Sequence, residues 1–198
     1  MVEKLSMPSN IEHLKTCFLC TYPPRECGIA SFTYDLSTAM DKRFNPKLKS
    51  LVVAMNEDDH FLKGYPEKVI SQVDRDDIIN YLDIAKKLNE NDNIKIICVQ
   101  HEFGLFGGEY GCFLIPFLES LNKPVVITFH TVLPDPDEYR QKIVKAISER
   151  VAAIVVHADR AKDILIQNYK IDPKKIFKVH HGIPNVPFKN QKEHHSSL

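Results

Sequence analysis

Short apolar runs alternate along the chain with segments whose apolar residues recur every three or four positions. The short runs are bounded by polar or turn-forming residues and predict seven β-strands, which cover residues 14–21, 48–55, 68–73, 94–100, 125–129, 151–156 and 176–179. The segments with helical spacing predict five α-helices, which cover residues 29–43, 78–85, 110–121, 134–147 and 160–169.

The order of these elements indicates the fold class. Strands and helices alternate, except for one step that leads from the second strand directly to the third. Such alternation is typical of parallel sheets, and the nearly continuous apolar run at residues 94–100 is typical of a strand buried on both faces. The sequence therefore predicts an α/β fold with a Rossmann-like, doubly wound, mainly parallel sheet of about seven strands and helices on both faces. Pro116 falls inside the third predicted helix and is expected to kink it.

The length of 198 residues fits one large domain. We expect residues 1–13 to form an N-terminal extension, residues 14–187 to form the Rossmann-like domain, and residues 188–198 to form a polar, disordered tail. Pro184 and Pro187 are expected to end the regular structure.

Charge and hydropathy exclude several classes of partner. The chain carries 26 basic and 26 acidic residues and has no dense stripe of lysine and arginine, so we expect neither a nucleic acid nor an anionic membrane as partner. No apolar run approaches the ~20 residues of a transmembrane helix, and residues 1–15 lack the apolar core of a signal peptide. These features predict a cytoplasmic protein without a transmembrane segment.

The five cysteines are scattered, and two of them form a C-x-x-C pattern at Cys17 and Cys20. This pattern occurs in redox pairs, but here it lies within a predicted strand, where residues three apart point to opposite faces. We therefore favour two buried core thiols over a redox pair, in a reducing compartment.

Candidate chemistry gathers directly after the predicted strands. In open α/β sheets, ligands bind outside the carboxyl ends of the strands, and histidine follows four of five such ends. The polar and glycine residues at these ends are Arg25, Cys27, Gly28, His101, Glu102, Gly104, His130, Thr131, His157, Asp159, His180, His181 and Gly182.

Several interpretations of these residues stay open. Gly28 begins a predicted helix whose amides could face a phosphate, or it is a turn glycine. His101 and Glu102 could do acid–base work or bind substrate, or they could form a satisfied loop pair. The segment around Gly28 is not a dinucleotide fingerprint, because it lacks G-x-G-x-x-G.

The sequence gives little support for a metal site or for a Ser-His-Asp catalytic triad. His101, His130 and His181 could be imagined as zinc ligands, but no H-E-x-x-H motif or paired cysteine spacing accompanies them. We therefore expect no metal. A G-x-S-x-G nucleophile elbow is also missing.

An ordered set of motifs resembles a known family. The motifs are YPPRECGIASF, QHEFGLFGGEYG, VVITFHT, VVHAD and KVHHGIP, each at the end of a predicted strand or just before a helix. Together they resemble the N-terminal half of family 4 glycosyltransferases of the GT-B architecture, over residues 14–186.

The resemblance implies an activity and a set of roles. Such transferases have two Rossmann-like halves facing a cleft. They move a sugar from a nucleotide-sugar donor to a sugar or glycan acceptor, with retention at the anomeric carbon and with no metal or further cofactor. By the resemblance His130 is the catalytic residue, contacting the transferring sugar near the leaving group. The other implied substrate-binding residues are Arg25, Cys27 and Gly28 in the first loop, His101 and Glu102 on the acceptor side, Gly104 in the turn that follows them, and His181 and Gly182 where the chain leaves for the second half.

The chain also departs from the family pattern. Cys27 precedes Gly28 where the family often has paired glycines, and the sequence ends near the point where the donor-binding half would begin. By the resemblance, that half holds a Lys/Arg pair and an E-x7-E segment. We therefore expect a hexosyltransferase-like half that is inactive alone and needs its C-terminal half in cis or in trans.

Two alternatives and one further expectation complete the analysis. A non-catalytic carbohydrate- or partner-binding module derived from the same half-fold is the main alternative. A nucleotide-binding regulator or dehydrogenase-like domain is disfavoured by the missing glycine fingerprint. Phe103, Leu105 and Phe106 are expected on the exposed rim, which would favour self-association.

Overall fold

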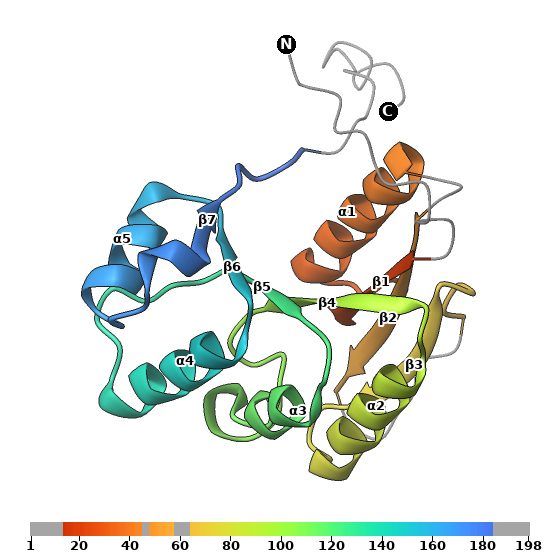
Figure 1. Ribbon diagram of the computed structural model, residues 1–198, viewed down its shortest axis with the longest axis horizontal. Helices are drawn as coiled ribbons and strands as arrows, with labels where there is room; N and C mark the ends of the chain where they lie inside the picture. The colour runs from red at the N-terminus through yellow and green to blue at the C-terminus, as the bar shows by residue number, and fades with distance from the viewer. Residues whose placement is uncertain (1–13, 45–47, 58–63, 184–198) are drawn as a thin grey trace, which may run out of the picture.

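The computed structural model describes residues 14–44, 48–57 and 64–183, which form an α/β sandwich around one sheet (Figure 1). The seven strands of this sheet are β1 (Leu14–Cys20), β2 (Leu48–Asn56), β3 (Val69–Asp74), β4 (Ile94–His101), β5 (Val125–Phe129), β6 (Ala153–Val156) and β7 (Ile176–Lys178). Their spatial order is β3-β2-β1-β4-β5-β6-β7. Every neighbouring pair is parallel, so the prediction of a Rossmann-like parallel sheet is confirmed.

Helices cover both faces of the sheet, as predicted. They are α1 (Gly28–Phe44), α2 (Ile78–Glu90), α3 (Leu114–Ser120), α4 (Glu138–Arg150) and α5 (Asp159–Gln167), with short 3-10 turns at Glu109–Gly111 and Pro173–Lys175. In Figure 1, α1 lies on one side of the sheet and α2, α3 and α4 lie on the other. The strand order explains this division. The chain moves from β1 to β2 in one direction and from β4 to β7 in the other, and right-handed crossovers then place the helices on opposite faces.

The apolar core divides in the same way. A large cluster joins side chains of the sheet to α2, α3, α4 and Leu165 of α5. A smaller cluster contains Phe18 and Val52 and packs against Leu36 and Met40 of α1. The sheet is therefore buried on both faces at its centre, as its apolar strands require.

The C-x-x-C cysteines belong to these two clusters. Cys17 lies in the large cluster and Cys20 in the small one, and both are fully buried. Burial raises the pKa of Cys20 to about 12 and also raises the pKa of Cys17. All five cysteines are free, so the interpretation as core thiols is confirmed.

The third predicted helix is shorter than expected. Tyr110 and Gly111 have positive φ values of 53° and 83°, which break the helix, so that α3 begins only at Leu114. The expected kink at Pro116 is wrong, because this proline lies in the first turn of α3, where its missing N–H has no helical partner to lose. Asp77 caps the N-terminus of α2, where its side chain accepts a hydrogen bond from the Ile79 amide.

Some expectations fall outside the described residues. These are the N-terminal extension at 1–13, the stop at Pro184 and Pro187, and the tail at 188–198. Of the helices in the described part of the chain, none combines the length and the apolar character needed to cross a membrane.

Candidate functional site

A groove of about 780 Å³ lies beside α1, on the same face of the sheet, where side chains of the strands are not covered by the helix. In-register side chains of neighbouring strands form its floor, among them Cys98 beside Val126 and Gln100 beside Thr128. At the carboxyl ends of the strands the groove opens between the first turns of α1 and the segment after β7. The lining at this end is polar and aromatic: Gly28, Ser31, Phe32, His130, His157, His180, His181 and Gly182.

Three histidines surround one phenylalanine at this open end. The ring centroids of His130, His157 and His181 lie 4.7, 5.5 and 5.0 Å from that of Phe32. His157 is also 5.4 Å from His130 and 5.0 Å from His181, again between centroids. The fold therefore brings together histidines that follow three different strands, β5, β6 and β7.

Hydrogen bonds orient these imidazoles. Nε2 of His130 donates to Oε1 of Gln100 at 2.9 Å, and Nδ1 of His157 donates to the carbonyl oxygen of Val179 at 2.8 Å. Nδ1 of His181 donates to the carbonyl of Gly182 at 2.7 Å. A neutral imidazole has one donor and one acceptor nitrogen, so Nδ1 of a neutral His130 keeps a lone pair that can accept a hydrogen bond. Nε2 of His157 is buried and has no hydrogen-bond partner among the described residues.

His130 is held neutral in this cluster. Burial, followed by the neighbouring His157 and His181, lowers the pKa of His130 to about 4. A neutral ring in a partly apolar groove is suited to polar but uncharged groups, such as sugar hydroxyls.

The first turn of α1 borders the same opening. A Cβ added at Gly28 would meet nothing within 4 Å, and Gly28 has no positive φ, so neither packing nor a turn requires glycine there. Sγ of Cys27 instead accepts a hydrogen bond from the Ala30 amide at 3.4 Å and lies 3.1 Å from Oγ1 of Thr21. The helix thus presents an open N-terminal turn toward the groove, the arrangement that anions favour.

His101 lies elsewhere, in the interior. Its side chain is 0% exposed and packs against the rings of Phe103, Phe106 and Phe129, with centroids 5.0 to 5.8 Å away. Neither ring nitrogen has a hydrogen-bond partner among the described residues. Burial, followed by the neighbouring His130, lowers the pKa of His101 to about 3. His101 is therefore neutral, and it lies in the core and not in the groove.

Glu102 is engaged within its own loop. Its Oε1 accepts from the Phe103 amide at 2.9 Å, and its Oε2 accepts from Oγ1 of Thr131 at 2.7 Å. Oε1 therefore bonds within the loop after β4, and Oε2 connects that loop to the one after β5.

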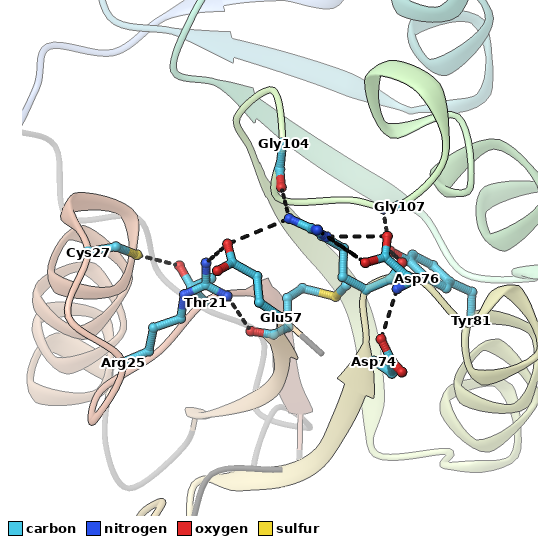
Figure 2. A network of polar contacts seen from close by, with 11 residues as sticks. Thr21, Arg25, Cys27, Glu57, Asp74, Asp76, Tyr81, Gly104 and Gly107 are labelled. Carbon is cyan, nitrogen blue, oxygen red and sulfur yellow. Dashed lines mark hydrogen bonds and ion pairs between the residues drawn. The ribbon is translucent and has the colours of Figure 1, made fainter. Parts of the chain in front are cut away.

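A second polar group lies at the ends of β1 to β4 (Figure 2). Arg25, from the loop after β1, forms an ion pair with Glu57, which follows β2. Arg75, which follows β3, donates to the carbonyl oxygen of Gly104 at 3.1 Å, and Gly104 has a φ of 89° that favours glycine. Arg25 and Gly104 thus belong to this network, while Gly28, His130, His181 and Gly182 belong to the groove.

The expected exposure of the loop after β4 is wrong for two residues. Leu105 and Phe106 are 8% and 2% exposed and belong to the large core cluster. Phe103 is partly buried against the same cluster. These side chains therefore pack against the core and do not form an exposed rim.

Two residues of the site were missed in the sequence. Phe32 was not among the candidate site residues, because helical spacing alone cannot distinguish a core position from one that lines a groove. Gln100 is 2% exposed, and the signal for it was a polar residue at the end of an otherwise apolar strand.

Within residues 14–44, 48–57 and 64–183, no three His, Cys, Asp or Glu side chains are arranged to hold a metal ion.

Similar folds occur in solved structures of low sequence identity. A glycosyltransferase from Rickettsia africae is 15% identical, with a TM-score of 0.58, over 86% of this chain and 44% of that one. Anabaena HepE in complex with UDP and glucose is 12% identical, with a TM-score of 0.55, over 86% and 45% of the two chains. A UDP-N-acetylglucosamine 2-epimerase from Rickettsia bellii is 11% identical, with a TM-score of 0.55, over 85% and 45%. The chain thus spans less than half the length of these proteins.

Sequence comparison goes further than the fold. No curated protein sequence matches the chain. The family model described as Glycosyltransferase Family 4 matches residues 28–185, which include α1, the histidine cluster and every residue that lines the groove except Phe18. The chain therefore belongs to Glycosyltransferase Family 4.

Proposed function

We propose that this chain is the acceptor-side half of a retaining glycosyltransferase that uses a nucleotide-sugar donor. The observation that carries the proposal is His130, a neutral imidazole oriented by Gln100 at the open end of the groove. The nucleotide-sugar acts as co-substrate, and no other cofactor is proposed. The transferred sugar is a hexose in this proposal.

The chemistry needs groups of this kind. In the transfer, the bond between the anomeric carbon and the donor phosphate breaks, and a bond from that carbon to an acceptor oxygen forms. The acceptor hydroxyl proton leaves with the nucleoside diphosphate. In this proposal His130 accepts a hydrogen bond from a hydroxyl of the transferring sugar, and the amides at the start of α1 face the departing phosphate.

Two further observations support the proposal that this chain is one half of a two-half enzyme. The chain spans 44–45% of the length of the similar structures, and Anabaena HepE was solved with UDP and glucose bound. In a two-half enzyme the cleft between the halves excludes water, which would otherwise hydrolyse the donor. We therefore propose that the chain alone does not transfer sugar and that a donor-binding half completes it, in cis or in trans.

The test is a transfer assay in two arms, with UDP-glucose and a panel of saccharide acceptors. One arm uses the chain alone, and the other uses a protein that joins the chain to a donor-binding half. We expect turnover only in the second arm. There, His130→Ala should lower kcat by about 100-fold or more, the effect of losing a preorganised polar contact in the transition state, with little change in the donor KM. His130→Gln, which keeps a polar group at this position, should lose less.

Other results would point elsewhere. Robust turnover by the chain alone would overturn the proposal that a second half is needed for transfer. Saccharide binding without transfer in either arm would favour the alternative, a non-catalytic carbohydrate-binding module.

A further inference from the structure

Two arginines share one carboxylate at the ends of three neighbouring strands. Arg25 follows β1, Glu57 follows β2 and Arg75 follows β3, and these parallel strands lie side by side. Oε1 of Glu57 forms an ion pair with Nη2 of Arg25 and lies 3.6 Å from Nη1 of Arg75. The Glu57 carboxylate therefore pairs with both guanidinium groups; Figure 2 shows Glu57 beside Arg25.

Both arginines are held in place without Glu57. Nη1 of Arg25 also donates to the carbonyl oxygen of Met55 at 3.4 Å. Arg75 donates to the carbonyl of Gly104 at 3.1 Å and pairs with Asp76 at 3.1 Å between Nη2 and Oδ2. Asp76 balances part of the charge of Arg75, so Arg25 is the cation that depends most on Glu57.

Glu57 is the exposed member of this group. Its side chain is 53% exposed, compared with 18% for Arg25 and 28% for Arg75. An exposed ion pair contributes only about 0–1 kcal/mol, so the Glu57 carboxylate is released at little cost. The guanidinium groups are partly buried and oriented, and paired guanidinium groups suit carboxylate and phosphate oxygens.

We propose that Arg25 and Arg75 form a subsite for an anionic group, a carboxylate or a phosphate, carried by the acceptor sugar. Glu57 occupies this oxyanion position in the free protein and moves aside when the acceptor binds. The proposal rests on the proposed function, because it assigns a substrate class to the acceptor side of that enzyme.

The position of the subsite suits an acceptor that reaches the groove. Arg25 precedes Gly28 by three residues, so their Cα atoms are at most about 11 Å apart. Gly28 borders the open end of the groove where the transferring sugar is proposed to lie. An acceptor whose anionic group contacts Arg25 can therefore direct a hydroxyl toward that end.

The test measures binding to the 198-residue chain by calorimetry, with no transfer step involved. Glucose 6-phosphate, glucuronate and glucose are compared, with inorganic phosphate and acetate as the free anions. We expect glucose 6-phosphate or glucuronate to bind more tightly than glucose, and the preferred one identifies the anion. Glu57→Gln should tighten binding of the preferred sugar several-fold, because it removes the competing charge. Arg25→Gln should weaken it by at least about 10-fold, as the loss of a charge-assisted hydrogen bond implies.

A matched pair elsewhere provides the control. Arg150 and Glu119 form an ion pair with side chains 31% and 53% exposed, close to the values for Arg75 and Glu57. Glu119→Gln and Arg150→Gln should leave binding unchanged. Equal changes in sugar affinity at both pairs, or no gain in affinity in Glu57→Gln, would overturn the subsite. Because Glu57→Gln removes no cation, its result tests the subsite even if Arg25→Gln fails to fold.

The outcomes also separate the two proposals. Transfer to neutral sugars without any binding of anionic sugars would refute the subsite and keep the proposed function. Binding of anionic sugars that depends on Arg25, without transfer by the joined protein, would refute the enzyme and keep the subsite. Binding of free phosphate or acetate with no preference for the anionic sugars would refute the assignment to an acceptor.

Discussion

Nε2 of His130 donates a hydrogen bond to Oε1 of Gln100 at 2.9 Å, joining the ends of two adjacent strands. Gln100 is 2% exposed, so the packed sheet fixes its amide, and the amide in turn fixes the imidazole. Because the amide is uncharged, it orients His130 without favouring the protonated ring.

Replacing this amide with a carboxylate should change the charge of His130. In Gln100→Glu, a negative group within hydrogen-bond distance favours the imidazolium, so the pKa of His130 should rise from about 4 toward or above 6.5. Histidine resonances followed by NMR across pH would measure this change. Gln100→Leu, which adds no charge, is the control. An unchanged His130 titration in Gln100→Glu would show that the two side chains do not interact in solution.

The buried His101 should make stability depend on pH. Its pKa is about 3 in the folded chain and about 6.5 when unfolded, so between these values the unfolded chain binds more protons. Stability should therefore fall as pH falls through this window, by up to about 1.4 kcal/mol per pH unit for each such histidine. Urea unfolding of wild type and His101→Leu at pH 7.5 and pH 5.0 would test this. The free energy of unfolding should differ less between pH 7.5 and pH 5.0 in the variant than in the wild type.

His130 contributes in the same direction down to about pH 4, so some pH dependence should remain. Phe106→Leu changes the packing around His101 without removing a titrating group, and it should keep the wild-type dependence. The same pH dependence in His101→Leu and in wild type would contradict the prediction.

Two glycines should respond oppositely to alanine. An ideal Cβ at Gly107 would lie 1.9 Å from the Arg75 carbonyl oxygen and 2.8 Å from the Phe113 ring, so Gly107→Ala should destabilise the chain by about 2–4 kcal/mol. A Cβ at Gly28 meets no atom within 4 Å, and Gly28→Ala should be neutral or stabilise by up to about 1 kcal/mol.

Thermal unfolding of both variants measures these effects. Gly28→Ala should also weaken nucleotide-sugar binding in a protein that contains both halves, because the added methyl group occupies the open turn of α1. A strongly destabilised Gly28→Ala would show that the chain itself requires this glycine.

The Tyr81 hydroxyl should stabilise the loop after β4. Tyr81 is 1% exposed; its hydroxyl donates to the Arg75 carbonyl at 2.9 Å and accepts from the Gly107 amide at 2.9 Å. Tyr81→Phe leaves the amide and the carbonyl without these partners, so the free energy of unfolding should fall by about 1–3 kcal/mol. Chemical denaturation measures the loss. Tyr34→Phe, at an exposed tyrosine of α1, is the control and should change little.

Much of the fold was predictable from the sequence. The spacing of apolar residues located the strands and all but one of the helices, because a strand or helix with a buried face must repeat its apolar residues with its own period. The exception was the helix at 110–121, where Tyr110 adopts a left-handed conformation that periodicity does not report. The rule that ligands bind at the carboxyl ends of parallel strands also directed attention to the edge of the sheet where the groove opens and the histidines gather.

The arrangement along that edge depended on tertiary structure. His101 ends β4 in register with Phe129 of β5, and His130 comes one residue later. The two rings therefore point to opposite faces of the sheet, so that one is buried among phenylalanines and the other lines the groove. The gathering of His130, His157 and His181 around Phe32 depends on the strand order and on the face that α1 covers. The sequence by itself determined the elements and the polar residues at their ends, since those follow from local spacing. Only the tertiary structure decided which of these residues meet, because such contacts join positions far apart in the chain.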